Sequence, residues 1–269
     1  TAMAYSGLGR AGFAWDDYSL VRDNALTGDW ANFTQFFSVD LWESTRLAPT
    51  ESGFYRPLFL VSLAIDRSLF GLSAGAAHLH SVFWHLLAIA LLFRLGQRIH
   101  SNRVGLIAAT LFALHPVQHE AVALIAARND SMATVFVLLA VLLLLDAPTS
   151  RRRLTLGAVC FFCALLSKES ALFTPVFLWL LDRTRKTSRH QRTRYLSLGI
   201  ALAAYLALRW QSSVGSSPWP SLTDWSNGFG KLPAIFGSYA EMLVWPSYLT
   251  PARSIDYLDS LPQLMPFLG

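Results

Sequence analysis

HLHSVFWHLLAIALLFRLGQRI, residues 78–99, is apolar and reaches the length of about 20 residues that a helix needs to cross a bilayer. The segment ends in a basic cluster formed by Arg94, Arg98 and Arg103. Because arginine and lysine collect on the cytoplasmic side of membrane proteins, this end is predicted to face the cytoplasm. His78 and His80, at the start of the segment, are then predicted to lie near the outer side.

Five more apolar segments follow, and every basic junction between them falls on the same predicted side. They are VGLIAATLFAL (104–114), SMATVFVLLAVLLLLD (131–146), LTLGAVCFFCALLS (154–167), ALFTPVFLWLLD (171–182) and YLSLGIALAAYLALRW (195–210). The basic junctions are the triple arginine at 151–153 and the loop at 183–194. The sequence therefore predicts an all-α, polytopic membrane protein, with six spanning helices within residues 78–211.

The two ends of the chain complete one predicted membrane domain over residues 1–269. Residues 1–77 are predicted to form an outer loop, in which 56–70 is too short to cross and is expected to lie in the interface as a helix. Residues 212–269 are predicted to hold an outer loop and one more helix, which over 233–249 is either a seventh span or a partly inserted segment. With no signal peptide or apolar helix near its start, the chain is expected to be truncated at both ends.

The composition agrees with a membrane protein and argues against a nucleic-acid-binding one. Hydrophobic residues make up 53% of the chain and charged residues 14%, whereas soluble domains carry about 25% charged residues. The net charge is +5, but the basic residues lie in short clusters beside apolar runs. This is the positive-inside pattern rather than a basic binding face. Cys160 and Cys163 lie within an apolar segment and are predicted to be small buried side chains.

Ionisable residues recur on the predicted outer side of the membrane. They are Asp16, Asp17, Arg56, those of the string HPVQHEAVALIAARND (115–130), Lys168 and Glu169. Such groups are costly at membrane depth and are usually retained for function. The pattern favours an integral membrane enzyme whose active site faces the periplasm, the cell exterior or the lumen of the endoplasmic reticulum.

Five motifs, in this order, resemble a known family. FAWDD (13–17), FYRPLFLVSLAIDRSLFGL (54–72), HLHSVFWHLL (78–87), LFALHPVQHEAVALIAARNDSMATVFVLLA (111–140) and LLSKESALFTPVFLWLL (165–181) resemble the membrane part of the transmembrane and tetratricopeptide-repeat-containing O-mannosyltransferases and their bacterial relatives. These enzymes belong to the C-type (GT-C) glycosyltransferase superfamily. The chain departs from the pattern at Ser81, where the family often has Asn, and at His119, where it often has Thr.

The resemblance implies a GT-C helical bundle that moves a sugar, mannose in this family, from a polyprenyl-phosphate donor to a hydroxyl of a protein or glycan acceptor. Such a transfer needs a carboxylate near the acceptor hydroxyl and cations around the departing phosphate. By resemblance to the acidic motif of the superfamily's first outer loop, Asp16 is assigned as the base and Asp17 as its helper. The alternative is that both are solvated loop residues that cap a helix.

Five charged side chains form the predicted donor site. Arg56 precedes Pro57, which favours a helix start with free amides beside a guanidinium. Arg128 is predicted to contact phosphate, with Asp130 orienting it or capping the helix. Lys168 is predicted to contact phosphate or sugar with Glu169 beside it. A purely structural ion pair at Lys168 and Glu169 is the alternative.

His115, His119 and Glu120 have a spacing that suggests a metal site. Pro116 breaks the helical register that would align the two histidines, and no third ligand lies nearby. No metal and no cofactor are therefore expected, and His115 and Glu120 are kept as candidate substrate contacts. Two other functions stay open: a transporter or flippase of lipid-linked sugars, which usually shows an internal repeat, and a membrane metalloenzyme.

Overall fold

The computed structural model describes residues 5–45, 52–146, 150–185, 191–216 and 222–246. All regular elements among these residues are helical, which confirms the predicted all-α class. The chain divides into a larger unit, residues 1–114 with 121–217, and a smaller unit, residues 115–120 with 218–269. Each unit is described by itself.

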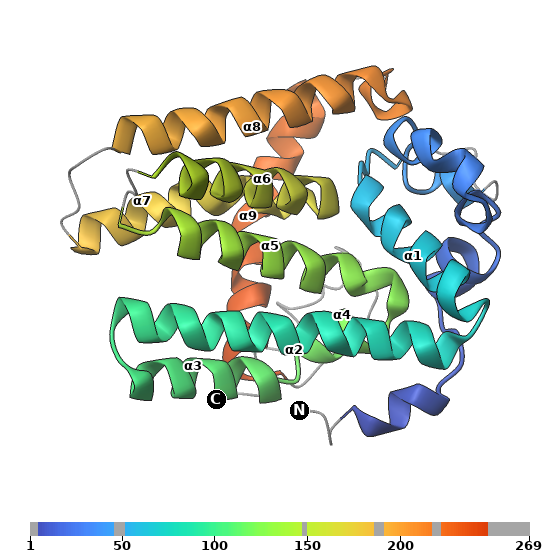
Figure 1. The fold of residues 1–269 in the computed structure, drawn as a ribbon, viewed down its shortest axis with the longest axis horizontal. Helices are drawn as coiled ribbons and strands as arrows, with labels where there is room; N and C mark the ends of the chain where they lie inside the picture. Colours follow the sequence, from blue (N-terminus) through green and yellow to red (C-terminus); the bar gives the residue numbers. More distant parts are fainter. Residues whose placement is uncertain (1–4, 46–51, 147–149, 186–190, 217–221, 247–269) are drawn as a thin grey trace. The chain divides into compact units, whose positions relative to one another are not determined.

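The larger unit is a stack of helices. Figure 1 shows α2, α3, α5, α6 and α8 side by side, and the C-terminal ends of α2, α5 and α7 lie together at one end of the stack, where Asp146 pairs with Arg98 and Arg185. These helix ends carry or adjoin basic clusters, as the charge pattern predicts, while the crossing of a membrane stays a prediction. The bounds are α1 Pro57–Phe70, α2 Ala74–Ile99, α3 Asn102–Leu114, α5 Arg128–Leu144, α6 Arg151–Ser167, α7 Thr174–Arg185 and α8 Gln191–Gln211.

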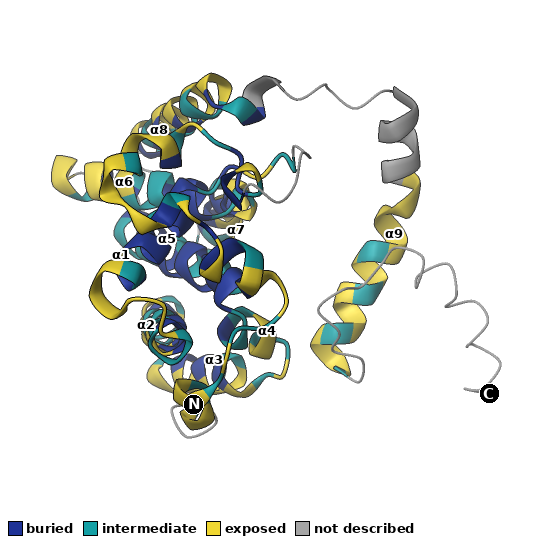
Figure 2. Ribbon diagram, turned by 90° about the vertical axis from the view of Figure 1, so that its right-hand side faces the viewer, coloured by how far each residue is buried: buried dark blue, intermediate teal, exposed yellow. Residues whose placement is uncertain are grey.

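Helix α5 forms the centre of the larger unit, because it packs between α2 and α6. Val141 and Leu144 on α5 and Phe161 and Leu165 on α6 are completely buried in one apolar cluster. Figure 2 shows this burial concentrated on α5, while the outward faces of α6 and α8 are exposed. Many of the exposed side chains are large and apolar, among them Leu79, Phe83, Leu106 and Ile200. A surface of this kind fits a lipid environment.

Two helices of the described residues are long and apolar enough to cross a membrane. They are α2, with 26 residues, and the 20-residue stretch Ile125–Leu144 that contains α5. Helix α3 is apolar but has only 13 residues. Helix α6, with 17 residues, is about 26 Å long, and α7, with 12, about 18 Å, against a hydrocarbon core of about 30 Å. The six-span bundle therefore stays a prediction.

The segment predicted to lie in the interface is helix α1, and one face of it packs into the protein. Phe59, Leu60 and Leu63 are buried, whereas Leu69 and Phe70 at its end are exposed. An interfacial position for this exposed end stays a prediction. In the smaller unit, α9 spans Leu222–Val244 with Pro233 inside it. The predicted segment 233–249 thus belongs to a helix that begins earlier, and residues 247–249 lie outside the described residues.

Glycines allow α2 and α3 to pack backbone against backbone. A Cβ atom added to Gly105 would lie 2.6 Å from the carbonyl oxygen of Phe93, and one on Gly96 would lie 2.5 Å from the Cα atom of Gly105. Neither clash can be relieved by turning a side chain. The short hairpin between α2 and α3 therefore depends on these two glycines.

We expect Gly105→Ala to lower the free energy of unfolding by about 1–3 kcal/mol, because overpacking forces the two backbones apart. The matched control is Gly199→Ala on α8, where an added Cβ meets nothing within 4 Å. Alanine favours a helix over glycine, so the control is expected to be neutral or stabilising. Thermal unfolding of both variants in detergent measures the difference. Equal unfolding midpoints would contradict the close-packing argument.

Candidate active site

The two aspartates of the first loop have different surroundings. Asp17 is completely buried, and its carboxylate accepts hydrogen bonds from the backbone N–H of Ala126 at 2.7 Å and of Ala14 at 3.3 Å. Asp16 is exposed. The residue before it, Trp15, has a φ of +50°, which is uncommon for a non-glycine residue and is often found at functional sites. Asp17 thus fixes the loop, and the loop presents Asp16 at the surface.

Burial raises the pKa of Asp17, although the hydrogen bonds from Ala126 and Ala14 act in the opposite direction. The anchoring carboxylate therefore takes up a proton at a higher pH than an exposed aspartate does. The assignment of Asp16 as the base and Asp17 as the helper stays a prediction, and the different burial of the two side chains fits it.

Arg128 lies in a buried polar network rather than at the surface. Its guanidinium is completely buried, pairs with Asp66 at 2.6 Å, and donates to the carbonyl oxygen of Ala77 at 2.7 Å and to the hydroxyl of Ser81 at 3.0 Å. A further N–H reaches the hydroxyl of Ser62 at 3.3 Å. The predicted phosphate contact would require a donor on an accessible surface, and Arg128 offers none. We therefore leave it out of the proposed donor site.

The network continues to a histidine on α2. Trp84 donates its indole N–H to Nε2 of His80 at 3.0 Å. In a neutral imidazole the other nitrogen then carries the proton, and Nδ1 of His80 lies 2.5 Å from Asp66, to which it donates. Asp66 thus joins α1 to α2 through His80 and to α5 through Arg128.

Lys168 and Asp130 form an ion pair at the predicted outer end of the larger unit. Lys168 follows α6 and Asp130 lies in the first turn of α5, and their side chains remain 27% and 41% exposed. The predicted pairing is thereby corrected, because Asp130 binds Lys168 rather than orienting Arg128. A ligand can reach this pair from solvent.

An apolar groove begins at Asp130 and runs between α5 and α7. Val137 and Leu138 from α5 form one wall, and Phe173 and Phe177 form the other. The groove has a cavity volume of about 230 Å³. Pockets for whole drug-sized ligands measure roughly 300–1,000 Å³, so this groove holds only part of a long chain.

Glu169 binds a different set of partners from its neighbour Lys168. Its Oε1 accepts from the backbone N–H of Tyr55 at 3.0 Å, and its Oε2 accepts from the guanidinium of Arg56 at 3.2 Å. Arg209, at the end of α8, lies 3.9 Å from Oε1. Lys168 and Glu169 thus have different partners, and the alternative that ion pairs at these two residues are only structural stays open. Burial raises the pKa of Tyr55 to about 12, so its phenol stays neutral and donates to the carbonyl oxygen of Phe37.

The predicted substrate contacts His115 and Glu120 belong to the smaller unit. Nδ1 of His115 accepts from the backbone N–H of Val117 at 3.3 Å, so Nε2 carries the proton and donates to the carbonyl oxygen of Leu243 at 3.1 Å. Their contacts with substrate stay predictions. Within the described residues, no group of three or more histidine, cysteine, aspartate or glutamate side chains is arranged to hold a metal ion.

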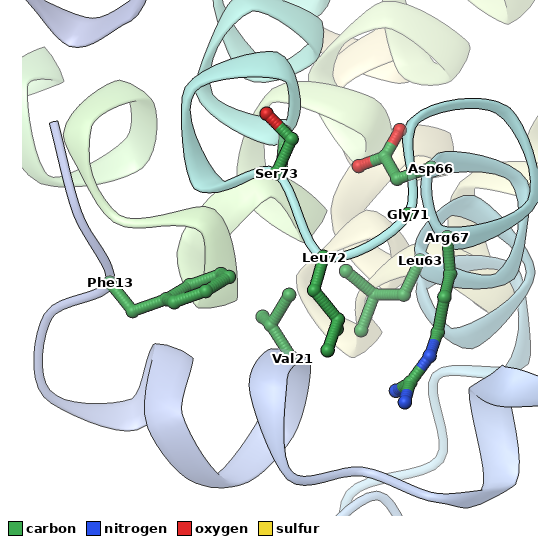
Figure 3. Close-up of a pocket in the computed structure, with 9 residues that line it drawn as sticks. Phe13, Val21, Leu63, Asp66, Arg67, Gly71, Leu72 and Ser73 are labelled. Carbon is green, nitrogen blue, oxygen red and sulfur yellow. The ribbon is translucent and has the colours of Figure 1, made fainter. Parts of the chain in front are cut away.

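A second cavity, between the first loop and the end of α1, is too small for a substrate. Figure 3 shows Phe13, Val21, Leu63 and Leu72 around it, with Asp66 at its edge. Its volume is about 10 Å³, which is room for about one water molecule. The groove beside Asp130 is therefore the better candidate for a lipid or sugar.

Comparison with known proteins identifies the family of the chain. Residues 56–210 match the family model described as dolichyl-phosphate-mannose-protein mannosyltransferase. The chain belongs to this mannosyltransferase family. The matched segment includes Arg56, Asp130, Lys168, Glu169 and Arg209, whereas the first loop with its two aspartates precedes it.

Individual members of the mannosyltransferase family are similar over much of the chain. Protein O-mannosyl-transferase Tmtc2 of Drosophila melanogaster is 28% identical over 273 residues, 94% of this chain and 29% of the relative. Protein O-mannosyl-transferase Tmtc1 of the same organism is 30% identical over 175 residues, 64% of this chain and 20% of the relative. Human protein O-mannosyl-transferase TMTC3 is 27% identical over 131 residues, 49% and 14% respectively. The chain thus spans less than a third of each relative, and no solved structure gives a significant match.

Three charged or titratable residues with partners in or near the candidate site are not among the site residues predicted from the sequence. Asp66 lies within the apolar segment 56–70, and an acid inside such a helix is itself a sign of a partner. The sequence predicts His80 only as an interface or packing residue near the outer side. Arg209 stands at the predicted outer end of α8, where the positive-inside rule expects few cations, and this exception was the available signal.

Proposed function

We propose that this chain forms the part of a membrane mannosyltransferase that moves mannose from a polyprenyl-phosphate donor to a hydroxyl of a protein or glycan acceptor. The transfer takes place on the non-cytoplasmic face of the membrane. The observation that carries the proposal is the juxtaposition around the start of α5. The loop bearing Asp16 is bound to Ala126 through Asp17. Four residues after Ala126, Asp130 forms the accessible ion pair with Lys168 and also lines the apolar groove.

The chemistry divides between the carboxylate and the cations. Asp16 takes the proton of the acceptor hydroxyl, whose oxygen then forms a bond to the anomeric carbon of the sugar. The bond between that carbon and the phosphate oxygen breaks, and its electron pair leaves with the polyprenyl phosphate. Lys168 and Arg56 stabilise the negative charge that collects on the phosphate. Asp130 holds the ammonium group of Lys168 in place until the donor binds.

The groove supports a lipid-linked donor rather than a free sugar nucleotide. Its walls are apolar, and its polar end carries the ion pair of Lys168 and Asp130. A polyprenyl phosphate has the same division into an apolar chain and an anionic end. The first isoprene units would occupy the groove, and the rest of the chain would extend along the exposed apolar faces of the helices.

We expect Lys168→Met to raise the KM for the donor by roughly tenfold or more and also to slow transfer. A charge-assisted hydrogen bond to phosphate contributes about 1.5–3 kcal/mol, and Lys168 retains part of it because its side chain is only partly exposed. The measurement is transfer of radiolabelled mannose from a polyprenyl-phosphate donor to an acceptor peptide in liposomes. Arg183→Gln, an exposed cation of α7, is the control and should leave the KM unchanged. An unaltered KM in Lys168→Met would refute the assigned donor site.

A further inference from the structure

The carboxylate of Glu169 is surrounded by the donors that usually bind a phosphate. One of its oxygens faces the backbone N–H of Tyr55 and the guanidinium of Arg209, and the other faces the guanidinium of Arg56. Both Nε and Nη2 of Arg56 lie 3.2 Å from Oε2. Guanidinium forks and backbone N–H groups are the recurrent partners of carboxylate and phosphate alike. These donors come from two elements far apart in the sequence, the segment before α1 and the end of α8.

The two arginines are held in place independently of Glu169. The guanidinium of Arg56 stacks on the ring of Phe54, with 4.4 Å between its central carbon and the ring centroid. Arg209 donates to the carbonyl oxygen of Gly53 at 2.8 Å and reaches the hydroxyl of Tyr205 at 3.5 Å. The cations would therefore stay near their positions if the carboxylate moved away. An anion site of this kind is preformed.

The site carries more positive than negative charge and is open to solvent. Two guanidinium groups face one carboxylate, and the side chains of Glu169 and Arg209 remain 31% and 29% exposed. Lys168 directly precedes Glu169 in the chain, so the Cα atoms of these two residues lie about 3.8 Å apart. Its ammonium group thus brings a third cation to this end of the unit, where Asp130 is its partner. The phosphodiester of a lipid-linked donor carries one negative charge, as Glu169 does, and the polyprenyl phosphate released by transfer carries up to two, which would match this cluster better.

We propose that Glu169 is an internal substitute for the phosphate of a lipid-linked donor, and that the phosphate displaces it from an anion site built by Tyr55 N–H, Arg56 and Arg209. This inference rests on the proposed function for the identity of the ligand. It assigns a ligand contact to Arg209, and it makes Glu169 a competitor of the donor rather than a contact to it. The carboxylate keeps the two arginines paired while the site is empty and raises the cost of binding an anion.

The test is the affinity for farnesyl monophosphate, measured by titration calorimetry on protein in nanodiscs, with farnesol and inorganic phosphate as separate titrants. Glu169→Gln keeps an oxygen for Tyr55 N–H but removes the competing charge, so we expect binding of farnesyl monophosphate to tighten by roughly 3- to 10-fold. Arg209→Gln should weaken it by about tenfold or more. The affinity for farnesol should not change in either variant. Inorganic phosphate should follow the same order of variants, at lower affinity, because the apolar groove does not help it bind.

Matched controls come from an exposed pair in the first loop. Asp23→Asn and Arg22→Gln each remove one member of the ion pair between these residues, which lies at the surface, and should leave both affinities unchanged. Thermal unfolding midpoints report whether each variant is folded. If Glu169→Gln is unfolded, Arg209→Gln and Arg209→Lys decide the question: a loss of phosphate affinity with Gln and partial recovery with Lys supports the site, and unchanged affinity with both overturns it.

The outcomes separate this inference from the proposed function. Weaker or unchanged binding in folded Glu169→Gln overturns the idea of a competing carboxylate and leaves Glu169 as a structural link between α8 and the segment before α1. If the protein transfers mannose but substitution of Arg209 does not change the affinity for phosphate, the anion site is overturned and the proposed function stands. Phosphate binding with the expected order of variants, in a protein that transfers no mannose, supports the anion site and refutes the proposed function.

Discussion

Asp16→Asn is expected to lower turnover by about 10²- to 10⁴-fold while the affinity for the polyprenyl-phosphate donor is kept. The substitution preserves the shape of the side chain but removes its ability to take a proton in the transition state. Asp16 is exposed and its neighbour Asp17 is buried in backbone hydrogen bonds, so the exposed carboxylate is the one that an acceptor can reach. Donor affinity should survive because the assigned donor site lies on other elements.

Two control variants distinguish loss of the base from loss of charge or of folding in the same loop. Asp23→Asn removes an exposed carboxylate from the same loop and should leave turnover unchanged. Asp17→Asn replaces one acceptor oxygen with an N–H donor, which faces the N–H of Ala126 or Ala14, so it should lower both turnover and the unfolding midpoint. The assay is mannose transfer in liposomes, with donor binding and thermal unfolding measured on the same preparations. Transfer by Asp16→Asn at the wild-type rate would remove Asp16 from the mechanism.

Asp66→Leu is expected to lower the free energy of unfolding by about 3–5 kcal/mol. The guanidinium of Arg128 is completely buried, and Asp66 is the acid that neutralises it. Removing one partner of a buried ion pair leaves the other charge uncompensated, which costs far more than the pair contributes when intact. Nδ1 of His80 would lose its acceptor as well.

The double variant Asp66→Leu with Arg128→Met tests this explanation. Because it removes both charges and puts apolar side chains in their place, it should recover most of the lost stability. The exposed Arg22→Gln change serves as the control and should not shift the unfolding midpoint. Unfolding in detergent, followed by circular dichroism, gives the comparison. A double variant as unstable as Asp66→Leu alone would show that packing, rather than the unpaired charge, determines the loss.

The helices could be predicted from the sequence because their signals are local. Apolar runs bounded by arginine clusters predicted the segments that became α2, α5, α6 and α8, and the same charges predicted which helix ends lie together. The bounds moved by a few residues: α2 begins at Ala74 rather than at His78, and α7 at Thr174 rather than at Ala171. Helix lengths follow from turns and caps that the hydrophobic pattern does not mark.

The partners of the charged residues could not be predicted in the same way. Arg128 and Asp130 are two residues apart, yet one binds Asp66 on α1 and the other binds Lys168 after α6. Lys168 and Glu169 are adjacent, and they too bind different elements. Spacing along the chain shows which residues share a helix face but not which distant segment packs against that face. The residue types of the site were therefore predictable, while its connections required the fold.

Three of these connections meet within five positions of the chain. Ala126 binds the first loop, Arg128 binds α1 and Asp130 binds the segment after α6. A shift of one residue turns a helix by about 100° and would direct all three groups away from their partners. Insertions and deletions should thus be rare between Ala126 and Asp130 during evolution, even where the amino acids themselves vary. We therefore expect the length of this short segment to be conserved more strictly than its amino acids.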